Sequence, residues 1–205
     1  MTRFVRRGLI LLTLAGIAAA QEKKAPSLFA QNTEHGIQIQ APPTGGKDQL
    51  WEAQVGKGAW WSDAHVSVNH RVDSFAIDVI VQRLAGKDPM REGWKTPAEI
   101  AKGERDGYLD KRSDGSASHW KEMRVKSEDP KAKISGLPGK GHQHHIVLID
   151  EKEGKKELIQ YFVISSEVLY VVTLTFDDEG YKKYWAREGQ MILGSIKKCK
   201  VEKKK

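Results

Sequence analysis

The chain has 205 residues, one cysteine and a formal charge of +7. One cysteine excludes an intramolecular disulfide, and the length suits one domain with a sizeable core. The excess charge lies at the two ends: three arginines stand near the N-terminus, and residues 197–205 hold six lysines and one glutamate. The formal charges of residues 21–196 sum to −1. The main part of the chain therefore lacks the positive charge that binds a phosphate backbone, and nucleic-acid binding is not expected.

Residues 1–20 have the pattern of a secretory signal peptide. Arginines precede an uncharged, mostly apolar run from Gly8 to Ala20, and Ala18 and Ala20 supply the small side chains of a cleavage site. The run is shorter than the ~20 apolar residues of a membrane-spanning helix, although an uncleaved anchor is the alternative. We therefore expect cleavage near Ala20 and export to the periplasm or the extracellular space.

The exported part is predicted to hold one folded domain over residues 34–198. The polar, aperiodic residues 21–33 predict a flexible leader, and residues 199–205 predict a basic tail that touches anionic surfaces weakly. Near the start of the domain, Ile37 and Ile39 alternate with glutamines. This alternation predicts a half-buried strand that ends at the following pair of prolines.

Two strands, or one strand with a strong bulge, are expected in the region from Val66 to Val81. Val66 and Val68 place apolar side chains at even positions, whereas the run from Phe75 to Val81 places them at odd positions. A regular strand keeps its parity, so a turn or a bulge is expected near 71–74.

A helix is predicted to begin at Thr96. Thr96 can cap it, Pro97 suits its first turn, and Glu99 stands at the third position of a capping box. Gly103 and Gly107 each weaken the helix interior by roughly 1 kcal/mol relative to alanine.

The last third of the chain predicts three antiparallel strands and a helix. Strand-like runs at 144–150, 157–164 and 168–176 are joined by short polar connections. In the third run both faces are largely apolar, so both are expected to be covered. A final helix is predicted to begin at Asp177–Asp178 and to fray at its glycines. The order of elements favours an α+β fold with an antiparallel sheet covered by helices.

Four segments carry a resemblance to a known group: "GIQIQAP", "ISGLPGKGHQHHIVLID", "VLYVVTLTF" and "YWAREGQMILGSIK". Their order and hydrophobic character over about residues 34–198 resemble the PsbP-like α/β/α sandwiches. That group includes the extrinsic subunit of the oxygen-evolving complex and many bacterial exported domains. The resemblance implies an adaptor that binds other proteins without catalysis, sometimes with incidental metal contacts.

The histidines of "GHQHH" are the candidate metal ligands. On a strand, His142 and His144 share one face and His145 lies on the other. Two imidazoles at this spacing can bind Zn, Cu or Ni if a third ligand arrives from elsewhere in the chain. The alternative is that the histidines are half-exposed at a loop-to-strand junction and titrate near neutral pH. The candidate third ligands are His65, His70 and His119.

Trp60 and Trp61 are the candidate partner-binding residues. They lie with Trp51 in a glycine-flanked region. Aromatic side chains are enriched among the residues that anchor protein interfaces. Packing of these tryptophans in the core is the simpler interpretation. The acids at 177–179 are explained by helix capping as well as by cation binding. Cys199 is expected to be an exposed or semi-buried thiol without a role, and cross-linking between chains is the alternative.

No catalytic residue and no cofactor is predicted. The "GLPGKG" segment lacks the order of a phosphate-binding loop, and no nucleophile elbow or metalloprotease motif occurs. The favoured hypothesis is an exported, non-enzymatic binding or adaptor domain for an unidentified protein partner. The alternatives are a metal-handling protein that uses His142 and His144, and a hydrolase whose site is assembled from distant residues.

Overall fold

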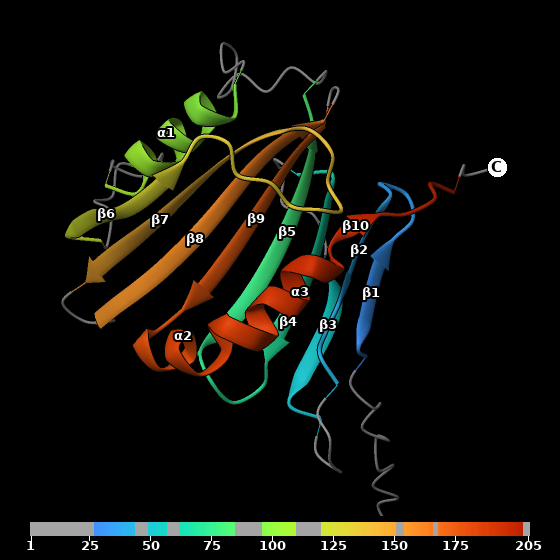
Figure 1. Ribbon diagram of the computed structural model, residues 1–205, viewed down its shortest axis with the longest axis horizontal. Coiled ribbons are helices and arrows are strands. Elements are labelled where there is room, and N and C mark those ends of the chain that lie inside the picture. The colour runs from blue at the N-terminus through green and yellow to red at the C-terminus, as the bar shows by residue number, and fades with distance from the viewer. Residues whose placement is uncertain are drawn as a thin grey trace, which may run out of the picture.

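The computed structural model describes residues 27–43, 49–56, 62–84, 96–109, 120–150, 154–165 and 168–202. Its main element is a seven-stranded sheet in the order β3-β4-β5-β9-β8-β7-β6 (Figure 1). Every neighbouring pair is antiparallel, which confirms the expected sheet. The strands are β3 (Trp51–Gly56), β4 (Ala64–His70), β5 (Phe75–Arg83), β6 (Glu122–Asp129), β7 (Lys140–Asp150), β8 (Gly154–Ser165) and β9 (Val168–Phe176).

The change of parity between β4 and β5 marks a turn, as the sequence predicts. β4 ends at His70 and β5 begins at Phe75. Val66 pairs with Val79 and Val68 pairs with Ile77, so even positions of β4 and odd positions of β5 share one buried face. The four residues of the turn, 71–74, reverse the chain so that the apolar side chains of both strands lie on the same face of the sheet, although they are even-numbered in β4 and odd-numbered in β5.

The three predicted runs form the meander β7-β8-β9, but β7 begins earlier than the sequence indicates. Its first residue is Lys140, because β8 continues far enough to pair with it through Ile164. Gly141 also permits close packing here: a Cβ at this position would lie 2.3 Å from the carbonyl oxygen of Ala132. All three candidate histidines therefore lie inside a regular strand.

Helices α2 (Asp178–Tyr184) and α3 (Gln190–Ser195) cover one face of the sheet, joined by a π-helical turn over Trp185–Gly189. Asp177 caps α2, since its Oδ1 accepts from the N–H of Gly180 at 2.7 Å. The predicted fraying at the glycines is wrong. A Cβ at Gly180 would lie 2.5 Å from the carbonyl oxygen of Ser74, so tertiary contact uses the glycine and outweighs its low helix propensity.

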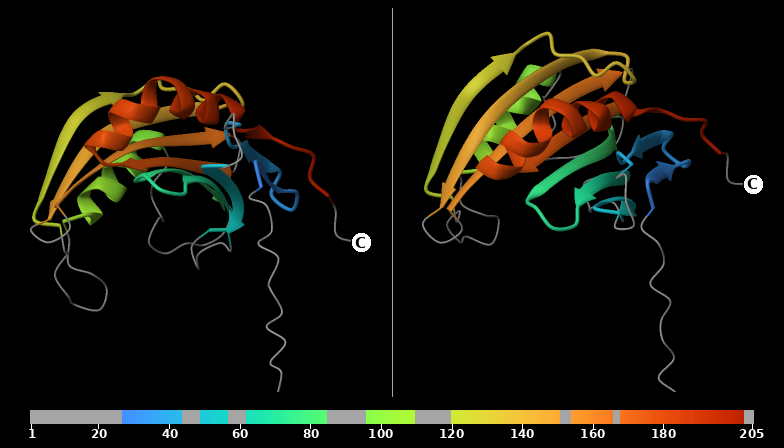
Figure 2. Two further views of the ribbon diagram at one scale, coloured as in Figure 1. Left: turned by 90° about the horizontal axis from the view of Figure 1, so that it is seen from below. Right: turned by 60° about the horizontal axis from the view of Figure 1, so that its bottom comes forward.

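Helix α1 (Pro97–Gly107) covers the opposite face (Figure 2). The capping box is confirmed: the N–H of Glu99 donates to Oγ1 of Thr96, and the N–H of Thr96 donates to Oε2 of Glu99. Ile100 and Ala101 are buried against the sheet. With helices on both faces, the predicted sandwich arrangement is present.

A small sheet in the order β1-β2-β10 corrects the predicted leader. Residues 29–32 form β1 and pair with β2, so the prediction of a flexible leader over 21–33 is wrong for them. This strand shows no clear apolar alternation, because Ala30 is the one buried side chain of β1. The folded domain also extends past residue 198, where the sequence predicted its end. The N–H of Cys199 donates to the carbonyl oxygen of Gly36 at 2.9 Å. The strands are β1 (Phe29–Asn32), β2 (Ile37–Gln40) and β10 (Lys197–Lys198).

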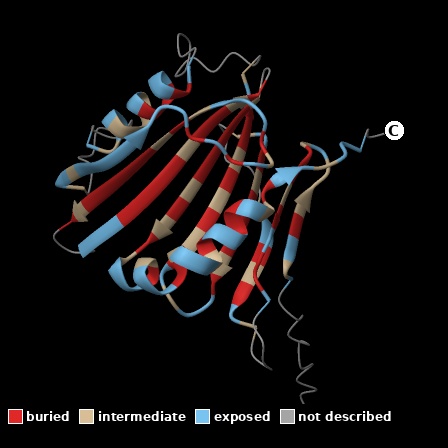
Figure 3. Ribbon diagram, in the orientation of Figure 1, coloured by how far each residue is buried: buried red, intermediate tan, exposed pale blue. Residues whose placement is uncertain are grey.

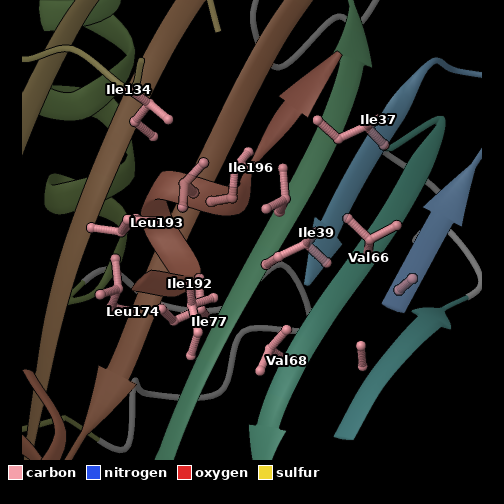
Figure 4. Packing of buried hydrophobic residues seen from close by; sticks show 14 of the residues in the cluster. Ile37, Ile39, Val66, Val68, Ile77, Ile134, Leu174, Ile192, Leu193 and Ile196 are labelled. Atoms are coloured by element: carbon pink, nitrogen blue, oxygen red, sulfur yellow. The ribbon is translucent and has the colours of Figure 1, made fainter. Parts of the chain in front are cut away.

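The largest core cluster lies between the sheet and α3, with β2 at its side. Figure 4 shows Ile192 of α3 pointing toward Ile77 and Leu174 of the sheet, and all three side chains are fully buried. Burial decreases toward the β6 edge, where most residues are exposed (Figure 3). Charged side chains on an edge strand oppose unwanted pairing with another chain.

Candidate functional site

Strand β7 buries all three histidines of the "GHQHH" segment. His142 and His144 face α1, because their cross-strand partners Phe162 and Gln160 point to that side, and His145 lies on the opposite face. The exposed fractions are 7% for His142, 0% for His144 and 9% for His145. The alternative of half-exposed histidines is therefore wrong, and the reason is the early start of β7.

His144 belongs to a buried polar cluster beneath α1. Its Nε2 lies 2.7 Å from Oε1 of Gln160, whose own Nε2 donates to Oγ1 of Thr173 at 3.2 Å. Gln160 Oε1 also accepts from the hydroxyl of Tyr108 at 3.3 Å. The amide orientation makes His144 Nε2 the donor and leaves Nδ1 as a bare acceptor. Burial lowers the pKa of His144 to about 4, so the ring is neutral at pH 7.

The described residues do not complete a metal site around His142 and His144. The Nδ1 atoms of both rings are buried and have no hydrogen-bond partner among the described residues. However, no group of three or more His, Cys, Asp or Glu side chains is gathered in the part of the chain that the structure describes. His65 contacts Asp78 instead, and His119 lies outside the described residues. The pair supplies two imidazoles, and the metal hypothesis remains an untested prediction.

A cavity of about 430 Å³ lies where the start of α1 meets the start of β7. The turn after β6 forms its third wall. His142 is the residue that connects this cavity to the histidine segment. The lining residues are Thr96, Pro97, Ala98, Pro130, Lys131, Lys133, Gly139, Lys140, Gly141 and His142.

The cavity has a positively charged rim. Lys131, Lys133 and Lys140 are exposed, and none of them forms an ion pair with another described residue. Two carboxylates lie nearby: Glu99 accepts from the N–H of Thr96, and Asp129 accepts from the N–H of Lys131 at 2.9 Å. Three ammonium groups against two carboxylates leave a small positive excess at this opening.

The same cavity lacks the arrangement of a nucleophile and its base. Thr96 carries the one hydroxyl among the described lining residues, and this group contacts Glu99 instead of His142. A covalent or hydrolytic mechanism requires the nucleophile and base to be within hydrogen-bond reach.

A second polar cluster lies on the other face, around Glu157 of β8. Its carboxylate is 1% exposed and accepts from Lys126, Lys155 and His145 at 2.6 to 2.8 Å. Burial raises the pKa of Glu157, but these hydrogen bonds outweigh the effect and hold the pKa at about 2. Lys155 also reaches Asp178 at 2.6 Å, so the cluster fastens α2 to the sheet.

A third cluster connects the β4–β5 turn to α2. The N–H of Asp73 donates to Nδ1 of His70 at 2.8 Å, so the proton of His70 is on Nε2, which lies 3.1 Å from the hydroxyl of Tyr184. That hydroxyl in turn donates to Asp73. Burial lowers the pKa of His70. The cluster is a closed set of hydrogen bonds and explains why this turn is held against the helix.

The sequence identified His142 but not the side chains around it. No sequence motif distinguishes the lysines of the rim from other surface lysines. Only the fold brings Thr96 and Lys131 together. Glu157 and Gln160 carried a usable signal, because they interrupt the apolar run "ELIQYFVI". The predicted partner-binding residues Trp60 and Trp61 lie outside the described residues.

The fold is a PsbP-like α/β/α sandwich. It is similar to the solution structure of cyanobacterial PsbP (CyanoP) from Synechocystis sp. PCC 6803, with a TM-score of 0.51 and 12% identity over 83% of this chain and 91% of that chain. A protein of unknown function from Pseudomonas aeruginosa, PA94, titled a putative regulator, has a TM-score of 0.37 and 12% identity over 81% of this chain and 93% of its own.

No protein-family model and no curated protein matches the sequence. The resemblance to CyanoP establishes the fold alone, and the score for PA94 is too low to support an inference. Within the described residues, no helix has the length and apolar character needed to cross a membrane. The function therefore has to be argued from the chain's own side chains.

Proposed function

We propose that the chain is an exported, non-enzymatic binding module that engages a protein partner at the cavity between α1 and β7. One observation carries the proposal. The cavity combines three exposed lysines that form no ion pair with a described residue with the ring of His142, whose buried Nδ1 has no hydrogen-bond partner among the described residues, and its described lining contains no paired nucleophile and base. The PsbP-like fold is compatible with such a role, and the signal-peptide pattern of residues 1–20 supports export.

The other polar clusters give less support for a function. Glu157 and its three donors, and Tyr184 with Asp73 and His70, satisfy one another internally. Buried polar groups that are fully paired stabilise one arrangement of a core and offer nothing to a ligand. By contrast, the exposed lysines that line the cavity beside His142 form no ion pair with a described residue, which is the property expected of a binding site.

The proposal is tested by capturing partners with the full chain, expressed in its own host with a C-terminal affinity tag. Ala98 lines the cavity and is exposed, so Ala98→Trp fills the cavity without changing charge. Ala186 is an exposed alanine on the helical segment of the opposite face, and Ala186→Trp is the matched control. We expect one protein, identified by mass spectrometry, to be captured by the wild type and by Ala186→Trp but not by Ala98→Trp.

Equal capture by all three forms would show that the cavity is not the contact surface. Substrate turnover by the purified protein that Ala98→Trp abolishes would replace the binding role with an enzymatic one. Circular dichroism of both tryptophan variants confirms that the comparison is made between folded proteins.

A further inference from the structure

The cavity beside His142 also indicates what kind of partner segment it accepts. We propose that it binds carboxylate side chains of an extended, acidic peptide segment of the partner, an inference that rests on the function proposed above. The argument uses the unpartnered histidine, the charge of the rim, the apolar walls and the volume of the cavity.

His142 supplies the first indication. It is 7% exposed, it lines the cavity, and its Nδ1 has no hydrogen-bond partner among the described residues. A buried polar atom without a partner is a free-energy penalty in the unbound protein. Burial lowers the pKa of His142, so the ring is neutral at pH 7 and carries a single N–H. A ligand in the cavity contacts the accessible part of this ring, whereas Nδ1 itself is buried.

The rim supplies the sign of the ligand's charge. Lys131 and Lys133 approach from the turn after β6, and Lys140 approaches from the first position of β7. The three ammonium groups form no ion pair with a described residue and exceed the two neighbouring carboxylates, Glu99 and Asp129, by one charge, so they are available to a ligand. Three cations from two segments favour an anion with more than one charged group along its length.

The walls favour a peptide over a small inorganic anion. Pro97, Ala98 and Pro130 contribute apolar surface, and lysine stems add more. A volume of about 430 Å³ is in the range of pockets that enclose organic ligands. Glutamate or aspartate side chains offer an apolar stem and a carboxylate, which matches walls of this kind below a basic rim.

Two properties of the site disfavour phosphate-bearing partners. No arginine is among the described lining residues, and bidentate recognition of phosphate depends on the planar arginine fork. The charge of the body, −1 over residues 21–196, also opposes a long polyanion such as a nucleic acid. A short acidic segment needs only the local charge of the rim.

The experiment measures binding of hexaglutamate and of hexaglutamine, each acetylated and amidated, to the purified chain by isothermal titration calorimetry. The test variants are the charge variant Lys131→Ala/Lys133→Ala, the cavity variant Ala98→Trp and the ring variant His142→Phe. The matched control is Lys182→Ala/Lys200→Ala, which removes two exposed lysines that form no ion pair with a described residue.

We expect hexaglutamate to bind and hexaglutamine not to bind. Affinity should fall about fivefold in Lys131→Ala/Lys133→Ala, since exposed charge pairs contribute modestly, and should stay within about twofold in the control. Ala98→Trp should abolish binding, and His142→Phe should weaken it while leaving the fold intact by circular dichroism. Raising the salt concentration should weaken binding further.

Equal losses in the two double-lysine variants would overturn the inference, because the contact would then be non-specific. Succinate binding as tightly as hexaglutamate would overturn the peptide as occupant, as would tighter binding of a phosphopeptide than of hexaglutamate. If hexaglutamate does not bind although Ala98→Trp still loses the captured partner, the acidic-peptide inference fails and the proposed binding function stands. If neither effect is seen, both fail.

Discussion

His144 and Gln160 face each other across β7 and β8, and Nε2 of His144 donates to Oε1 of Gln160 at 2.7 Å. Gln160 also contacts Oγ1 of Thr173 through its Nε2 at 3.2 Å. With the amide in this orientation the proton of His144 is on Nε2, and burial keeps the ring neutral. The hydrogen bond connects the histidine segment to the core under α1 instead of to solvent.

This arrangement predicts that acid destabilises the protein through His144. Its pKa is about 4 when folded, against the ordinary value of 6.5. Between these values the unfolded chain binds a proton that the folded chain does not, so the free energy of unfolding falls as pH falls from 6.5 to 4. The expected loss between pH 7 and pH 4.5 is about 2 kcal/mol from this residue. Urea denaturation at several pH values measures it.

His144→Gln retains a donor to Gln160 and removes the titration. The variant should show a shallower fall of stability over this range, although burial also lowers the pKa values of His70, His142 and His145, which still contribute. An unchanged pH dependence in His144→Gln would contradict the assignment.

Glu157→Gln should destabilise the protein by about 2 kcal/mol at pH 7. The substitution removes a buried carboxylate that accepts from Lys126, Lys155 and His145, and hydrogen bonds to charged groups are stronger than neutral ones. Chemical denaturation followed by tryptophan fluorescence measures the change. Glu122→Gln removes an exposed carboxylate paired with Arg124 and should change stability by less than about 0.5 kcal/mol.

Gly136→Ala should destabilise the protein by about 3 kcal/mol. A Cβ at Gly136 would lie 2.0 Å from the carbonyl oxygen of Ile196, so the segment after β6 would have to move away from β10. Gly194→Ala is the matched control, because a Cβ there meets nothing within 4 Å and alanine favours the helix by roughly 1 kcal/mol. Thermal denaturation should therefore show a lower midpoint for the first variant and a higher one for the second.

Tyr184→Phe should cost about 2 kcal/mol of stability. The hydroxyl of Tyr184 contacts Nε2 of His70 at 3.1 Å and donates to Asp73, so phenylalanine leaves the buried N–H of His70 without a partner. Tyr181→Phe is the comparison, since its hydroxyl has no hydrogen-bond partner among the described residues. Equal effects of the two substitutions in guanidinium denaturation would show that the hydrogen-bonded set is not stabilising.

At the candidate site, the sequence predicted the relative orientation of the histidines but not their burial. The spacing of His142 and His144 correctly placed them on one face, because alternation is a local property of a strand. Their burial was not predicted, since it depends on β8 extending to pair with Lys140 and on α1 covering that face. The flexible leader over 29–32 was wrong for a related reason: β1 is held by β2 and contributes little apolar surface of its own.

The sequence by itself determined β2, the strands β4 and β5 with the turn between them, both helix caps and the antiparallel meander. These features follow from periodicity, parity and capping, which act between residues close along the chain. Only the tertiary structure decided that Thr96, Lys131 and His142 surround one cavity, and that Glu157 accepts from two lysines and His145. Such clusters depend on which faces of distant segments meet, and that is set by packing of the whole core.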